Sequence, residues 1–162
     1  METILIALQA FQVAFLWMHD WVPLGSLNDV AAVRREYSLR DRIVTTLIQS
    51  VPWTIGLAGC LLHRGERWPG WLASWLWISY GLLFLGELRA WWLPYLFRPE
   101  PARAERYRRM FGRTHAFLPI RNGMAPNTLH TLLHVATAAT LLLLACGLPY
   151  PDPLLDAQSA FL

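Results

Sequence analysis

Two histidines, His130 and His134, stand four residues apart at the start of a long apolar run. Residues four apart share one face of a helix, so both imidazoles would point in the same direction. Imidazoles in this arrangement bind zinc or iron, or move protons as general acids and bases. They equally form hydrogen bonds to a neighbouring helix, and the spacing H-x-x-x-H alone does not separate these hypotheses.

A carboxyl group, that of Glu87, lies well inside another apolar run. Acidic side chains are expensive in hydrocarbon and are retained there chiefly for function, so Glu87 is a candidate general acid or base. A buried ion pair with an arginine is the structural alternative, although Arg89 would lie on a different side of the same helix. Arg89 itself either holds an anionic group or extends to the membrane surface.

An acid–histidine pair, His19 and Asp20, ends the first apolar run. An acid beside a histidine orients the imidazole ring or joins a metal shell, and the alternative is a plain helix end at the water interface. We predict catalytic roles for Glu87, His130, His134 and His19. We also predict that a divalent metal, zinc or iron, is held by His130, His134, His19 and Asp20.

A further set of polar residues is predicted to line the entrance of the site and to contact the substrate. Asn127 has a second interpretation, because an asparagine at that position is a natural N-cap for the last apolar run. His115 lies in a long loop that would have to fold over the opening. The full set is Arg89, Tyr95, His115, Arg121, Asn122 and Asn127.

The elements that carry these residues are four apolar segments. Hydrophobic residues make up 55% of the 162-residue chain and charged residues 15%, and nine tryptophans are present, a composition typical of membrane proteins. Each segment approaches the roughly 20 residues needed to cross a bilayer, where the backbone must be helical. We predict one all-α domain over 1–162, a four-helix transmembrane bundle with spans at about 3–21, 43–62, 71–97 and 128–148.

Arginine placement predicts the orientation of this bundle. The fourteen basic residues are all arginine; most lie in the first and third loops, and none lies at either terminus. By the positive-inside rule, loops one and three are cytoplasmic and both termini are outside. The absence of lysine suggests a GC-rich bacterial genome, so the predicted location is the bacterial cytoplasmic (inner) membrane.

Both cytoplasmic loops are predicted to contain short amphipathic surface helices. The sequences SLND at 26–29 and SLRD at 38–41 resemble capping boxes, the first before a short helix and the second before span two. Residues 99–112 form a basic amphipathic segment that ends at Gly112. This segment either sets the topology or binds lipid headgroups directly.

The predicted topology brings the candidate residues to a common depth. Glu87, His19, Asp20 and the pair on the last span all fall in the cytoplasmic half of the bilayer, whereas His63 belongs to the far side. Their polar faces should point into the bundle. Depth also permits a disulfide between Cys60 and Cys146, but two buried free thiols are the favoured interpretation.

These residues favour an enzyme that acts on a lipid or another lipophilic molecule from the cytoplasmic leaflet. A second hypothesis is a non-catalytic membrane subunit that binds a ligand, anionic lipid or a partner protein, and a third is haem binding by histidines of spans one and four. Four short spans form a modest core, so a homodimer or a partner subunit is expected. Nucleic-acid binding is not expected, because the arginines lie in short loops between apolar runs.

Overall fold

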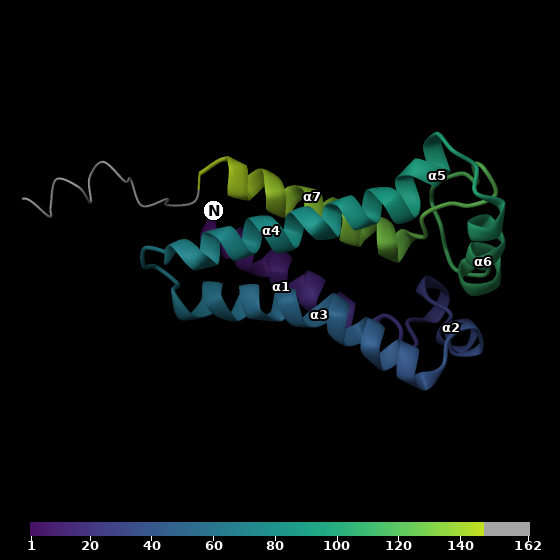
Figure 1. Ribbon diagram of the computed structural model, residues 1–162, viewed down its shortest axis with the longest axis horizontal. Helices are drawn as coiled ribbons and strands as arrows, with labels where there is room; N and C mark the ends of the chain where they lie inside the picture. The colour runs from purple at the N-terminus through teal and green to yellow at the C-terminus, as the bar shows by residue number, and fades with distance from the viewer. Residues whose placement is uncertain (148–162) are drawn as a thin grey trace, which may run out of the picture.

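The computed structural model describes residues 1–147 and is all-α (Figure 1). Position 148, where the fourth span was predicted to end, lies outside the described residues, as does the rest of the chain to 162. Within 1–147 there is no β-sheet, although Arg121 and Met124 form an isolated bridge. The helices are α1 (Glu2–Met18), α2 (Val30–Glu36), α3 (Leu39–Leu62), α4 (Gly70–Glu87), α5 (Leu93–Leu96), α6 (Pro101–Phe111) and α7 (Thr128–Ala145).

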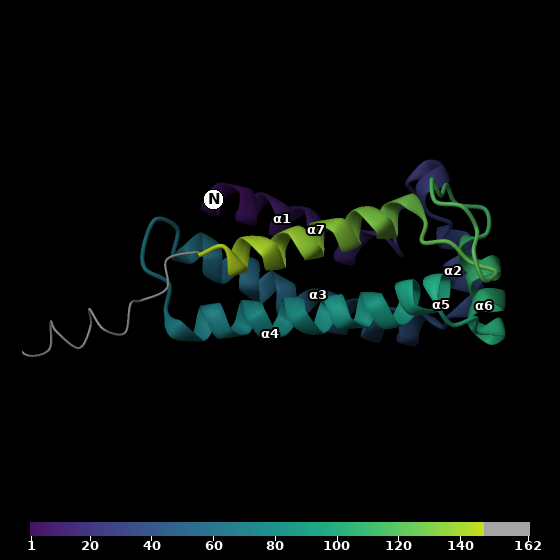
Figure 2. The same cartoon turned by 90° about the horizontal axis from the view of Figure 1, so that it is seen from above.

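Helices α1, α3, α4 and α7 run side by side along the long axis of the molecule (Figures 1 and 2). Three helical stretches are long and apolar enough to cross a membrane: α3, α4 continued through α5, and α7. Helix α1 has 17 residues and packs against α3 and α7. Three such helices are typical of a multi-pass membrane protein, and α1 is the shortest of the four predicted spans.

The long helices carry apolar side chains outside and polar side chains inside. Ile48 and Leu82 are 67% and 64% exposed, whereas Gln12 and Thr137 are fully buried. A bilayer solvates apolar surface and disfavours polar groups, so this distribution suits helices surrounded by lipid. It agrees with the expectation that the polar faces point into the bundle.

The capping predictions were confirmed at one helix and wrong in detail at another. Ser38 Oγ accepts a hydrogen bond from the backbone N–H of Asp41 at 3.1 Å and begins α3. Helix α2, however, is capped by Asp29, which accepts from the N–H of Ala32 at 2.8 Å. Ser26 cannot cap α2 because residues Gly25–Leu27 form a 3₁₀ turn of their own.

The predicted third span is not one continuous α-helix. Helix α4 ends at Glu87, and the next residues, Leu88–Trp92, form a π-helical turn in which the N–H of Leu93 bonds the carbonyl of Leu88. Such turns are rare and occur frequently at functional sites. The hydrophobic pattern gave no sign of this interruption.

The two ends of the bundle are built differently. We call the end with α2, α5, α6 and the loop 112–127 the capped end, and the end with the 63–69 turn the turn end (Figure 1). Helices α3 and α4 pack closely near the turn end and diverge toward the capped end (Figure 1). The close approach requires glycine, since a Cβ on Gly59 would lie 2.6 Å from Leu72 Cδ1.

Both cysteines are free thiols, as predicted, but the prediction that both are buried was wrong for Cys146. Cys60 is buried and Cys146 is exposed. The Gln9 amide donates to Cys60 Sγ at 3.4 Å, which links α1 to α3 inside the bundle.

Candidate functional site

Two adjoining cavities lie between the helices, toward the capped end. The outer cavity has a volume of about 420 Å³ and lies beneath α2 and α6. The inner cavity has a volume of about 490 Å³ and lies between α1, α3, α4 and α7. Side chains of α1, α3, the π turn and α7 form their common wall, which consists of His19, Gln49, Ala90, Trp91 and His130.

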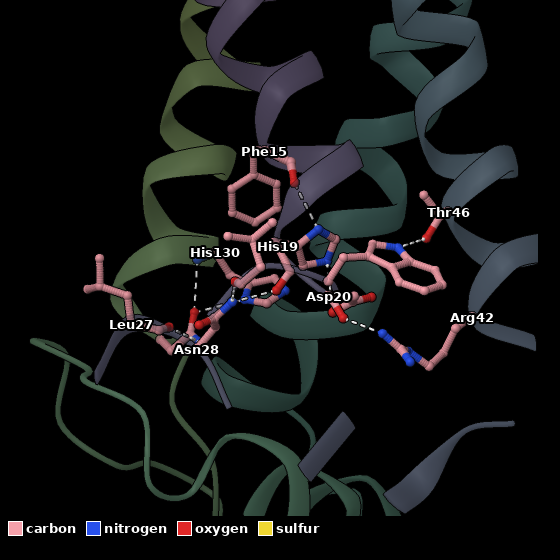
Figure 3. Close-up of polar contacts among 11 residues, drawn as sticks. Phe15, His19, Asp20, Leu27, Asn28, Arg42, Thr46 and His130 are labelled. Carbon is pink, nitrogen blue, oxygen red and sulfur yellow. Dashed lines mark hydrogen bonds and ion pairs between the residues drawn. The ribbon is translucent and has the colours of Figure 1, made fainter. Parts of the chain in front are cut away.

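His19 is held at this wall by oxygen atoms on both sides of its ring (Figure 3). Its Nδ1 lies 3.0 Å from the Phe15 carbonyl, and its Nε2 lies 3.3 Å from Asp20 Oδ1. The ring stacks on Phe15 and meets His130 edge-on, with centroids 5.7 Å apart. The predicted orienting acid is therefore present beside His19.

His130 is fixed by Asn127, the residue that begins α7. Asn127 Oδ1 accepts from the backbone N–H of His130 at 2.9 Å and lies 2.8 Å from its Nδ1. The amide is oriented by its NH₂ group, which donates to Thr114 Oγ1 at 3.2 Å. Because Asn127 Oδ1 only accepts, Nδ1 carries the proton, and the neutral ring keeps Nε2 as an acceptor.

His134 has the opposite arrangement of its ring nitrogens. It is buried and lines the inner cavity, and its Nδ1 accepts from the indole N–H of Trp92 at 3.1 Å. An indole N–H only donates, so the neutral ring carries its proton on Nε2. Trp92 belongs to the π turn, as does Trp91, whose ring lies 4.5 Å from that of His130. The π turn thus directs two consecutive tryptophans at the two histidines of α7.

Glu87 lines the inner cavity and is 5% exposed. Its Oε1 lies 2.8 Å from the Thr137 hydroxyl of α7, and its Oε2 is buried with no hydrogen-bond partner among residues 1–147. The alternative of an ion pair with Arg89 was wrong, because Arg89 is exposed and bonds Glu100 at 2.8 Å. Glu87 is therefore a buried carboxyl that keeps one oxygen unpaired.

Thr137 joins Glu87 to a polar network in the centre of the bundle. Its hydroxyl lies 3.1 Å from Gln12 Oε1, and the Gln12 amide donates to Thr140 Oγ1 at 2.9 Å. These contacts connect α1, α4 and α7 through side chains that are nearly or fully buried. The network holds the carboxyl of Glu87 at a fixed position.

The inner cavity is mostly apolar and reaches the outer surface of the bundle between α3 and α4. Three residues of its lining, Ile48, Leu82 and Gly86, are themselves exposed. They lie where the two helices diverge. An apolar molecule can therefore approach Glu87 from the side of the bundle. The remaining apolar lining comes from Phe15, Leu16, Pro52, Trp53, Leu83 and Leu133.

The outer cavity has a charged lining that was predicted in part, since the basic segment 99–112 and Asp20 were candidates but Arg42 was not. Arg42 of α3 and Arg103 and Arg106 of α6 line it, together with the acids Asp20 and Glu100. A sequence signal for Arg42 did exist. It stands seven residues before Gln49, which begins a heptad-spaced polar row that continues to Gly56 and His63.

The residues predicted to contact substrate have other positions. Tyr95 donates its hydroxyl to the Pro119 carbonyl at 3.1 Å, and Asn122 donates to the Tyr95 carbonyl at 3.1 Å. Arg121 lies over the Tyr95 ring, and His115 is exposed with Nδ1 2.7 Å from Thr128 Oγ1. The described linings of the two cavities include none of the six: Arg89, Tyr95, His115, Arg121, Asn122 and Asn127.

The predicted metal shell is not formed. Among the described residues, no group of three or more histidine, cysteine, aspartate or glutamate side chains is arranged to hold a metal ion. Each of the three histidines has a ring nitrogen in contact with a protein group. The partners are Phe15 O for His19, Asn127 Oδ1 for His130 and the Trp92 indole for His134.

Known proteins give no guide to this site. No family model, no curated protein and no solved structure matches the chain. The chemistry has to be inferred from the side chains that line the two cavities.

Proposed function

We propose that this chain is a four-span enzyme of the cytoplasmic membrane that binds a lipophilic molecule in the inner cavity and transfers a proton to or from it. Glu87 is the acid or base. The proposal is carried by one observation, the unpaired Oε2 of Glu87 in the lining of an apolar cavity. A buried polar atom without a partner costs about 1–3 kcal/mol, so it needs an explanation, and a bound reactant supplies one.

The Thr137 contact suits a carboxyl that changes its protonation state. An ionised Glu87 accepts the Thr137 hydroxyl proton at Oε1. A neutral Glu87 can donate a proton from Oε1 to Thr137 Oγ1, and the hydroxyl proton then turns to Gln12 Oε1 at 3.1 Å. Each state keeps a hydrogen bond, so a proton can move without disrupting the helix contacts.

The two α7 histidines supply complementary hydrogen-bonding groups. The neutral ring of His134 keeps an N–H at Nε2, which suits donation to an oxygen of the substrate. The neutral ring of His130 keeps an acceptor at Nε2, at the wall between the cavities. His130 is therefore suited to pass protons between Glu87 and the outer cavity, with His19 beside it.

The lipid bilayer is the proposed source of the substrate. The inner cavity reaches the apolar surface between α3 and α4, where a membrane-dissolved molecule would enter without crossing water. The positive-inside rule puts the arginine-rich capped end in the cytoplasm. The substrate would then enter from the cytoplasmic leaflet.

A pair of glycines on α4 provides a test of binding. A Cβ on Gly81 or on Gly86 meets no described atom within 4 Å, but Gly86 alone of these two lines the inner cavity. We expect Gly86→Leu to remove lipophilic molecules that co-purify with the protein, as measured by native mass spectrometry. Gly81→Leu should retain them, and equal retention in both variants would contradict the inner site.

Catalysis is tested by Glu87→Gln, which keeps the size of the side chain and its contact with Thr137. Membrane lipids of cells that express the wild-type chain or this variant would be compared by mass spectrometry. We expect wild type to convert a lipid that accumulates in the variant. Identical lipid profiles with retained ligand would exclude catalysis by Glu87 and favour the non-catalytic, ligand-binding subunit.

A further inference from the structure

The outer cavity contains a buried arginine, Arg42, that forms no ion pair with a carboxylate among residues 1–147. Arg42 is 6% exposed, and its Nε is buried with no hydrogen-bond partner among residues 1–147. Its Nη2 donates to the Asp20 backbone carbonyl at 2.6 Å, as Figure 3 shows, and its guanidinium lies 4.1 Å above the Trp21 ring. A guanidinium remains charged, and a buried charge needs a counter-ion. Arg42 therefore indicates a site for an anion.

Other donors line the same cavity from different elements. Arg103 and Arg106 stand three residues apart on α6, and the hydroxyl groups of Tyr37 and Thr45 come from beside α2 and from α3. Arg103 is positioned by the carbonyl of Ala90, to which its Nη1 donates at 3.3 Å. The cavity thus presents arginines and hydroxyls from several sides.

The two acids of this cavity already have cationic or histidine partners. Asp20 Oδ1 lies 3.3 Å from His19 Nε2. Glu100 accepts from Arg103 and Arg89, both at 2.8 Å, and these bonds hold the pKa of its carboxyl below the ordinary value. Among the described residues, neither of these carboxylates forms an ion pair with Arg42.

We propose that the outer cavity binds a phosphate monoester, carried as the headgroup of a lipid whose hydrocarbon chain occupies the inner cavity. This inference rests on the proposed function, because it names the substrate class of the same site. A phosphate offers three terminal oxygens to donors from several directions, whereas a carboxylate offers two. The shared wall of the cavities, of about 420 and 490 Å³, allows one amphiphile to occupy both.

The ligand chemistry is tested on the full purified chain in a neutral detergent. The probes are oleoyl lysophosphatidate, monooleoylglycerol, oleate and inorganic phosphate, and the readouts are the midpoint of thermal unfolding and tryptophan fluorescence. We expect lysophosphatidate to bind about tenfold more tightly than monooleoylglycerol or oleate, because charge-assisted bonds to phosphate are lost in both. Inorganic phosphate should bind more weakly still, because it lacks the hydrocarbon chain that would occupy the inner cavity.

Arginine variants locate the site. Arg42→Gln should weaken lysophosphatidate binding about tenfold. Arg106 is exposed on α6, so Arg106→Gln should remain folded and weaken binding several-fold even if Arg42→Gln does not fold. Arg40→Gln is the matched control, since Arg40 is exposed, stands two residues from Arg42 and is not in the described lining of the cavity. It should bind like wild type.

The outcomes separate this inference from the proposed function. Equal binding of monooleoylglycerol, or unchanged affinity in the folded arginine variants, would overturn the phosphate site. The proposed function would survive that result if Gly86→Leu still abolished binding of the lipid through its hydrocarbon chain. Inorganic phosphate that bound as tightly as lysophosphatidate would overturn the lipid assignment. Absence of binding by any lipid would remove both proposals.

Discussion

The two ends of the bundle are held together by different interactions. At the turn end, α3 and α4 approach closely because Gly56 and Gly59 have no side chain, and Leu72 and Leu76 fill the space. At the capped end, the helices diverge, and side-chain hydrogen bonds connect them to the loops. Asn28 illustrates this, since its amide donates to the carbonyls of His19 and Val22 at 2.6 and 2.8 Å.

This difference explains why the cavities lie where they do. Side chains of α4 pack directly against the glycines of α3 near the turn end, whereas the inner cavity lies where the helices are further apart. The polar contacts of the capped end hold the separated helices in place. A site that needs both space and fixed side chains is therefore built at the capped end.

The largest expected effect is that of Asn127→Ala at the capped end. The change removes the N-cap of α7 and leaves the partly buried partners of the fully buried Asn127 amide unpaired. We expect the free energy of unfolding to fall by about 2–4 kcal/mol, which would be detected as a lower midpoint of thermal unfolding in detergent.

The matched change at the turn end is His63→Ala. His63 is partly exposed, and its ring nitrogen lies 3.8 Å from a carboxylate oxygen of the exposed Glu66. This variant should unfold like wild type. Equal destabilisation by the two changes would show that side-chain contacts matter as much at the turn end.

A pair of glycine substitutions tests how the turn end is packed. A Cβ on Gly59 would lie 2.6 Å from Leu72 Cδ1, so Gly59→Ala should lower the free energy of unfolding by about 1–3 kcal/mol. Gly81→Ala meets no described atom within 4 Å and should stabilise α4 by about 0.5–1 kcal/mol. The two variants should therefore shift the unfolding midpoint in opposite directions, and shifts of the same sign would contradict the packing.

The smallest effect concerns the contact between α2 and α6 at the capped end. Arg109 bonds Glu36 at 2.8 Å and holds the pKa of this carboxyl below its ordinary value of 4.5. The ion pair therefore stabilises the fold fully above pH 4.5. This stabilisation is lost as the pH falls through the lowered pKa that Glu36 has in the folded protein. Glu36→Gln should slightly lower the midpoint of thermal unfolding at pH 7 and have a smaller effect at pH 3. An equal loss at both pH values would exclude this ion pair as the cause.

The sequence predicted those features that depend on neighbouring residues. Hydropathy located the long helices to within a few residues, and local capping patterns identified Ser38 and Asn127. The expectation that polar faces point into the bundle was also met, since Gln12 and Thr137 are fully buried. Each of these follows from the chain within one or two helical turns.

Features that depend on contacts between distant segments could not be predicted. The predicted metal shell is not formed among the described residues, and the positions of the rings depend on contacts with residues such as Asn127 and Trp92. Tyr95 and Asn122 contact each other where the long loop returns to α5, which no local pattern encodes. Arg42 was counted only as a topology signal, although it stands seven residues before the polar Gln49. Its contacts with Asp20 and Trp21 come from a distant segment and could not be predicted.

The π turn at Leu88–Trp92 has a consequence for how this chain can vary in length. A π turn accommodates one more residue than an α turn, so a chain that lacked one residue there could close the turn as ordinary α-helix. The span would keep its register on both sides, but the paired indoles that face His130 and His134 would be lost. Evolution could therefore remove this site by a single deletion without rebuilding the bundle.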